Sequence, residues 1–189
     1  GIGERIGLFY SVQGIVSIFM PAIMGIVADR WVPAHRLLAF CHAVAAIFMG
    51  ITGYIGMSKG ENVVFSDLFW TYTVSVAFYM PTLALSNSVS YTALTKAGLD
   101  TVKAFPPIRV FGTVGFIVSM LLVDYTGFQN NYNQFFASAV WGALLAIYSL
   151  TLPYCPVNKG GEKKSLVSAL GFDAFKLFGQ KRMAIFFIF

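Results

Sequence analysis

The chain has 189 residues, of which 57% are hydrophobic and 11% are charged, and its formal net charge is +5. Soluble domains have roughly a quarter of their residues charged, so this chain has too few charges to cover a water-facing surface. The composition excludes a soluble globular domain and predicts an all-α membrane protein whose helices face lipid over much of their surface.

Five long apolar segments follow one another along the chain, each bounded by charges or turn residues. Each is close to the roughly 20 residues that cross a bilayer as a helix, and none alternates apolar and polar residues as a strand would. We expect an internal piece of a longer protein, because the chain shows no signal-peptide pattern and stops inside a sixth apolar run. The five spans are residues 6–27, 37–57, 68–94, 107–123 and 132–152, and the sixth run is 183–189.

Basic residues fall mainly in alternate linkers. The stub before the first span and the second and fourth linkers hold only Arg5 and Lys59. Because Lys and Arg in short loops mark the cytoplasmic side, the first, third and fifth linkers are predicted to be cytoplasmic and the stub to face outward. These cytoplasmic linkers hold ten basic residues, namely Arg30, Arg36, Lys96, Lys103, Lys159, Lys163, Lys164, Lys176, Lys181 and Arg182.

The chain is therefore divided into three parts. Residues 1–152 form five transmembrane helices, residues 153–182 form a basic cytoplasmic loop, and residues 183–189 start the next helix. Apolar residues recur at helical spacing over 166–178. That pattern predicts a short helix, which either lies on the inner membrane surface or docks on its own protein.

The first cytoplasmic linker carries a short motif, with Gly25 followed by Asp29 and Arg30. It resembles the Gly-x-x-x-Asp-Arg signature of the major facilitator superfamily, although Trp31 follows where the family usually has glycine. The resemblance implies that the chain holds helices two to six of the N-terminal half and the start of helix seven. We expect Gly25 to allow close helix approach and all three motif residues to act in conformational gating. The alternative is an ordinary charged helix end.

Further strings resemble one family within that superfamily. They are Phe-Tyr-Met-Pro-Thr-Leu at 78–83, Phe-Pro-Pro-Ile-Arg at 105–109, and Lys-Arg-Met-Ala-Ile-Phe-Phe-Ile-Phe at 181–189. In this order they are similar to the bacterial nucleoside:proton symporters. The resemblance implies a multi-pass inner-membrane carrier that takes up a nucleoside such as uridine by proton symport with alternating access. It also implies that the proton is the coupling ion, that no other cofactor is needed, and that the proton-carrying residue lies elsewhere in the protein.

Arg109 is the one charged side chain inside a predicted span. The charge-free run 110–123 is too short to cross the hydrocarbon alone, so Arg109 is drawn towards the membrane, where it either serves function or snorkels to the interface. At about 100° per residue, Thr113 and Phe116 share its stripe. A guanidinium, a hydroxyl and an aromatic face suit the oxygens and flat base of a nucleoside. The family resemblance implies that these three residues contact the substrate.

Other polar residues in the spans leave two possibilities open. Ser86, Asn87 and Ser90 either line a pathway or bond to neighbouring helices, and Gln13 is similarly ambiguous. His42 is expected to be a hydrogen-bonded structural histidine rather than a proton relay.

Several functions compete with nucleoside transport. A carrier for a sugar or an organic anion could also use one arginine, and a non-transporting polytopic receptor is a further alternative. An enzyme would need clustered His, Asp or Glu in the spans, and the two cysteines lack metal-ligand spacing, so neither catalysis nor a metal site is expected. The expected partners are the nucleoside and the lipid bilayer, with no nucleic acid and no obligate protein partner.

Overall fold

The computed structural model describes residues 3–157 and is helical throughout, apart from short connections. Five long helices are joined by short connections, two of which contain a 3-10 turn, and a third 3-10 turn precedes the first helix. The helices are α1 (Ile6–Arg30), α2 (Ala34–Lys59), α3 (Phe65–Lys96), α4 (Thr101–Tyr125) and α5 (Asn133–Ser149), with 3-10 turns η1 (Gly3–Arg5), η2 (Gly60–Asn62) and η3 (Phe128–Asn130).

All five predicted spans are present as helices that are long and apolar enough to cross a membrane. The largest difference is in α4, which was expected over 107–123 and begins six residues earlier. Its start is fixed by Asp100, whose carboxylate accepts a hydrogen bond from the backbone N–H of Val102 at 2.9 Å. Pro106 and Pro107 therefore lie inside the helix rather than at its first turn. The predicted surface helix at 166–178 and the run 183–189 lie outside the described residues.

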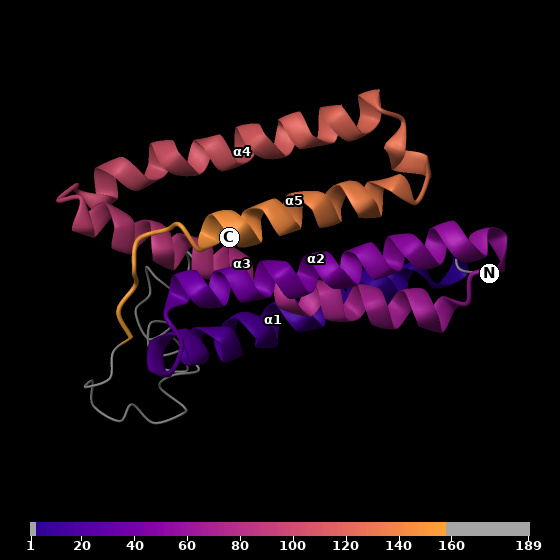
Figure 1. Cartoon of the computed structure of the whole chain (residues 1–189), viewed down its shortest axis with the longest axis horizontal. Coiled ribbons are helices and arrows are strands. Elements are labelled where there is room, and N and C mark those ends of the chain that lie inside the picture. Colours follow the sequence, from indigo (N-terminus) through magenta and orange to yellow (C-terminus); the bar gives the residue numbers. More distant parts are fainter. Residues whose placement is uncertain (1–2, 158–189) are drawn as a thin grey trace, which may run out of the picture.

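Helix α2 is the centre of the bundle and packs against both α3 and α5 (Figure 1). Its contact with α5 is made through small residues: a Cβ added to Gly142 would stand 3.0 Å from the Cβ of Ala46. Its contact with α3 includes two polar links, from Ser75 Oγ to the carbonyl oxygen of Ala45 at 2.8 Å and between the hydroxyls of Thr52 and Thr71 at 3.0 Å. Small residues and hydroxyl links are the usual means by which membrane helices associate.

Helices α1 and α4 are much less enclosed. Neither contains a buried residue in the described chain, and α4 reaches the bundle mainly through the end of α3, where the rings of Tyr91 and Phe105 stack at 4.3 Å. Figure 1 shows α4 running beside the bundle, with α5 between it and α2. On α4, Phe111 is 76% exposed and Leu121 is 62% exposed, as expected of side chains that face lipid.

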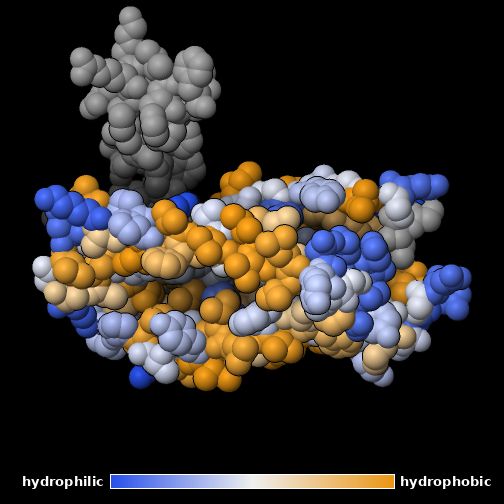
Figure 2. All heavy atoms as spheres, turned by 90° about the horizontal axis from the view of Figure 1, so that it is seen from above, coloured by the Kyte–Doolittle hydropathy of each residue, from blue (hydrophilic) through white to orange (hydrophobic). Residues whose placement is uncertain are grey.

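The bundle has two polar ends and an apolar middle. The α1–α2 and α3–α4 turns and the segment after α5 meet at one end, while the N-terminus and the other two turns meet at the opposite end (Figure 1). Hydrophobic residues fill the middle of the surface in Figure 2 and hydrophilic residues gather towards both ends. This pattern matches a bilayer-spanning bundle and places the alternate linkers on opposite sides, as the sequence predicts.

Candidate functional site: a cavity beside helix α4

A cavity of about 820 Å³ lies among the five helices. Its size falls within the range of small-molecule sites, which are mostly apolar with a few polar groups. Most of its wall is apolar or small, including Ala45, Ala46, Gly112 and Gly142. The polar and aromatic side chains that line it include Gln13, His42, Tyr72, Tyr79, Phe116, Ser138 and Trp141.

Several polar groups in the cavity wall have no partner within the described part of the chain. Gln13, His42 and Ser138 line the cavity, and none of them makes a side-chain hydrogen bond to another residue of 3–157. By contrast, Ser75 and Ser119 also line it, but their hydroxyls are used by the backbone of α2 and of α4 itself. The free groups can hydrogen-bond to a solute or to a part of the protein outside these residues.

The depth of Arg109 in the membrane follows from the full length of α4, which is longer than the predicted span. Thr113 is at the midpoint of the helix Thr101–Tyr125. With a rise of about 1.5 Å per residue, Arg109 lies about 6 Å from that midpoint. If α4 is centred in a hydrocarbon core about 30 Å thick, about 9 Å of hydrocarbon separates the Cα of Arg109 from the nearer boundary. This depth favours a functional arginine over one that anchors the helix at the interface.

Only one of the three residues predicted to bind substrate lines the cavity. Phe116 lines it, whereas Arg109 and Thr113 do not. Seen down α4, Gly112 and Ser119 lie about 60–80° from Arg109 on one side, and Thr113 lies about 40° away on the other. The Arg109–Thr113 stripe therefore runs along the edge of the cavity, and Phe116 belongs to both faces.

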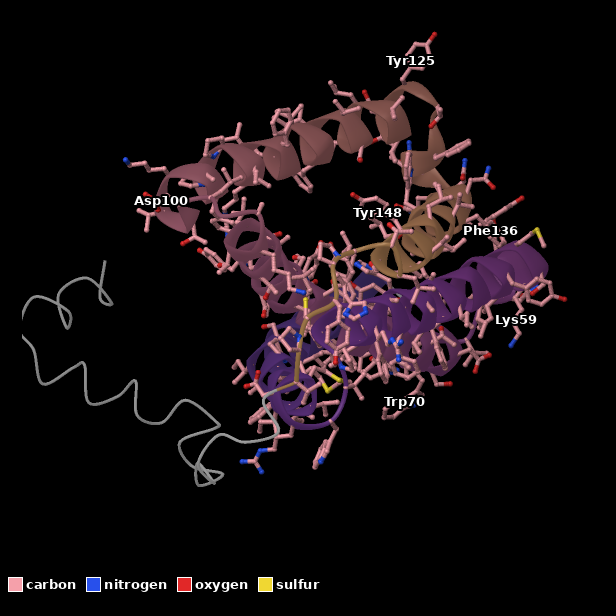
Figure 3. The ribbon with its side chains drawn as sticks, turned by 60° about the vertical axis from the view of Figure 1, so that its left-hand side comes forward. Lys59, Trp70, Asp100, Tyr125, Phe136 and Tyr148 are labelled. Carbon is pink, nitrogen blue, oxygen red and sulfur yellow. The ribbon has the colours of Figure 1, made fainter. Side chains whose placement is uncertain are left out.

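Arg109 and Thr113 have their polar groups available. Within residues 3–157, Arg109 has no ion-pair partner and Thr113 makes no side-chain hydrogen bond. This is unusual among the hydroxyls of the long helices, since Ser119 and Thr126 of the same region bond to carbonyls four residues back. A guanidinium and a hydroxyl thus stand one helical turn apart without hydrogen-bond or ion-pair partners in the described chain. Figure 3 labels Asp100 and Tyr125 at the two ends of this helix.

The predicted gating motif ends α1. Asp29 and Arg30 form the last turn of the helix and are both exposed. A carboxylate at the C-terminal end of a helix meets the negative pole of the helix dipole, which is unfavourable. The stability of α1 therefore does not explain why an aspartate stands at position 29. The close approach expected at Gly25 does not occur within residues 3–157, because a Cβ added there would meet no atom within 4 Å. In this part of α1, it is Met24, Val27 and Ala28 that pack against the buried cluster of α2 and α3.

Two further expectations from the sequence are corrected. The hydroxyls of Ser86 and Ser90 bond to carbonyl oxygens of their own helix, at 3.0 and 2.8 Å, instead of reaching a neighbouring one. His42 is buried but not hydrogen-bonded within the described residues, and it lines the cavity. The sequence also gave no reason to select Trp141 or Ser138, because the face of α5 that turns to the cavity is set by its packing on α2.

These features together define a multi-pass membrane protein with a solute-sized cavity, as in helical carriers. A family model described as "Nucleoside H+ symporter" matches residues 2–189. The chain belongs to this family. Its relatives are transporters, not enzymes.

Two relatives from Escherichia coli (strain K12) match over 187 residues, which is 99% of this chain. The xanthosine permease is 47% identical and the nucleoside permease NupG is 43% identical. The chain spans 43% of the length of each. The fold is similar to that in a crystal structure of a mutant of the nucleoside transporter NupG, with a TM-score of 0.82 and 43% sequence identity. The similarity covers 97% of this chain and 44% of the NupG chain. The five helices are therefore part of a major facilitator fold.

Proposed function

We propose that the protein to which this chain belongs takes up nucleosides by proton symport with alternating access. The family match carries the proposal: a nucleoside H+ symporter model covers nearly the whole chain, and the similar proteins are permeases for xanthosine or for nucleosides. The proton is the coupling ion, and no other cofactor is needed. The chain offers five apolar helices and a solute-sized cavity, as such a carrier requires.

Arg109, Thr113 and Phe116 form one side of the proposed nucleoside site. Arg109 can donate paired hydrogen bonds to carbonyl or ribose oxygens, and Thr113 can add a hydroxyl. The ring of Phe116 is 66% exposed and can stack on any base. The depth of Arg109 and the free polar groups of the stripe support this assignment. The stripe lies at the edge of the cavity, so residues outside 3–157 complete the site.

The gating residues and the membrane setting belong to the same proposal. Gly25, Asp29 and Arg30 stand at the end of α1 that the charge bias assigns to the cytoplasm, where alternating access opens and closes a carrier. The relatives from E. coli fit a bacterial inner-membrane protein. Uridine is the nucleoside we expect it to accept. We expect lipid around the bundle, no nucleic-acid partner and no obligate protein partner.

Uptake of labelled uridine by the full-length protein tests the proposal. Cells that lack other nucleoside carriers should accumulate uridine when they express it, and a protonophore should abolish accumulation. A matched culture expressing the Arg109→Ala variant is the control for uptake through the proposed site. Uptake of a sugar or an organic anion without uridine uptake would contradict the proposal, and so would binding of uridine without transport.

A further inference from the structure

The segment that follows α5 turns back onto the bundle. Cys155 is only 5% exposed, and it belongs to the buried cluster formed by Ala34, Leu38 and Cys41 of α2 with Leu85 of α3. The helix itself has already ended at Ser149. The chain is therefore fixed to other elements for several residues after α5, before it reaches the part of the protein beyond residue 157.

Two side chains from different helices hold this segment. Lys96, the last residue of α3, donates from Nζ to the carbonyl oxygen of Tyr154 at 2.5 Å, and its ammonium lies 5.7 Å from the centre of the Tyr154 ring. His35, in the first turn of α2, meets the same ring edge-on at 5.6 Å. The backbone N–H of Cys155 donates to Nδ1 of His35 at 3.3 Å. We call these four residues the clasp.

The chemistry of the clasp explains why it needs these residue types. A non-helical segment leaves its backbone groups without partners, and a buried N–H must find one. For Cys155 that partner is the ring nitrogen of His35. Lysine supplies a charged donor for the carbonyl of Tyr154 and a cation for its ring face. The two hydrogen bonds join residues 58 and 120 positions apart, so the clasp is a feature of tertiary structure rather than of the local sequence.

We propose that the clasp fixes the start of the connection after α5 to the ends of α2 and α3, so that these elements move as one body during the transport cycle. Its effect on transport rests on the proposed carrier function, whereas its effect on the structure does not. A carrier that alternates access by rocking needs the connection between its parts to transmit motion without local unfolding. The clasp positions this connection and does not touch substrate.

The exposure of the Cys155 thiol reports the state of the clasp directly. Purified full-length protein is treated with a water-soluble maleimide, and labelling at Cys155 is followed by peptide mass spectrometry. Lys96→Met keeps much of the apolar stem and removes the charged donor, so labelling should accelerate at least about tenfold, the change expected for loss of a charge-assisted hydrogen bond. His35→Phe keeps an aromatic ring but removes the acceptor, and it should also accelerate labelling.

Two matched variants serve as controls. Lys103→Met removes a lysine from the first turn of α4 at the same end of the bundle, where its side chain makes no hydrogen bond or ion pair with the described residues, so labelling should stay at the wild-type rate. Lys96→Arg keeps the charge and the donors and should restore slow labelling. Melting temperatures within a few degrees of the wild type would show that faster labelling reflects local opening rather than unfolding.

Uridine uptake and binding then test the mechanical role. Lys96→Met should lower the maximal uptake rate by about threefold or more, while the uridine dissociation constant stays within about twofold, as expected of a residue that affects conformational exchange. Unchanged labelling in both Lys96→Met and His35→Phe would overturn the clasp. Faster labelling with normal uptake would overturn its mechanical role. If the wild-type protein neither binds nor transports uridine, the proposed function fails, while the labelling experiment still decides whether the clasp exists.

Discussion

Replacing Arg109 with alanine removes the one charged side chain from the middle of α4, about 6 Å from its midpoint. The guanidinium has no hydrogen-bond or ion-pair partner within residues 3–157 and Arg109 is exposed there, so the substitution breaks no polar interaction between described residues. The variant should therefore fold and melt like the wild type. This separates an effect on binding from an effect on stability.

The expected loss of binding follows from the type of contact. A hydrogen bond to a charged group contributes about 1.5–3 kcal/mol, which corresponds to about 10- to 150-fold in affinity. Arg109→Ala should weaken uridine binding within this range. Arg109→Lys keeps the charge but loses the planar fork, so it should recover only part of the affinity.

The other two members of the stripe should give graded losses. Phe116→Leu keeps apolar volume but removes the stacking face, so binding should fall about two- to tenfold and to a similar extent for different bases. Thr113→Val removes one hydroxyl at nearly constant shape, and its effect should be the smallest, about threefold. Gly115→Ala on the same helix is a suitable control, because a Cβ there meets no atom within 4 Å.

Calorimetric titration of the purified full-length variants with uridine measures these effects. The melting temperature of each variant without ligand is recorded alongside. If Arg109→Ala binds uridine as tightly as the wild type, the arginine is only an interface anchor and the site is wrongly placed. An order in which Thr113→Val is worse than Arg109→Ala would also refute the reasoning.

Three other predictions concern gating, orientation and packing. Asp29→Asn should slow uptake several-fold and leave uridine binding almost unchanged, because Asp29 lies at the end of α1 and away from the cavity. A large loss of binding with an intact fold would contradict this prediction. A cysteine at position 59 should react with an impermeant reagent on intact cells and one at position 103 should not, and the reverse would invert the predicted orientation. Gly142→Ala should lower stability by about 1–3 kcal/mol because its Cβ would stand 3.0 Å from that of Ala46, and adding Ala46→Gly should restore it, as read from the melting temperature in detergent.

The fold was largely predictable because membrane helices are specified by hydropathy and length. All five spans were found, and the alternation of basic linkers agrees with the two ends of the bundle. The start of α4 was missed because two consecutive prolines usually mark the beginning of a helix, whereas Asp100 caps this one earlier. That shift matters for function, since it moves Arg109 from the edge of a span towards its middle.

Of the proposed site, the sequence could predict only the stripe on α4, where helical periodicity aligns Arg109, Thr113 and Phe116; their role in binding substrate stays a prediction. The contributions of His42, Gln13 and Trp141 to the cavity could not be predicted, because they depend on how α1, α2 and α5 are rotated against one another. The motif also led to a wrong prediction at Gly25, because no other helix approaches this glycine closely in the described chain. The clasp was equally inaccessible, since its members are far apart in the sequence.

The helices divide stability and function between them. Helix α2 is held on two sides, by the close contact at Gly142 and by the hydroxyl links to α3, and it supplies most of the buried residues. Helix α4 supplies no buried residue in the described chain. One of its faces lines the cavity, and the stripe that begins at Arg109 runs along the edge of the cavity. A helix with so few fixed contacts can shift against the bundle at little cost in packing. The stripe that we propose to contact substrate therefore lies on a helix with little fixed packing in the described chain, while α2 holds the rest of the bundle together.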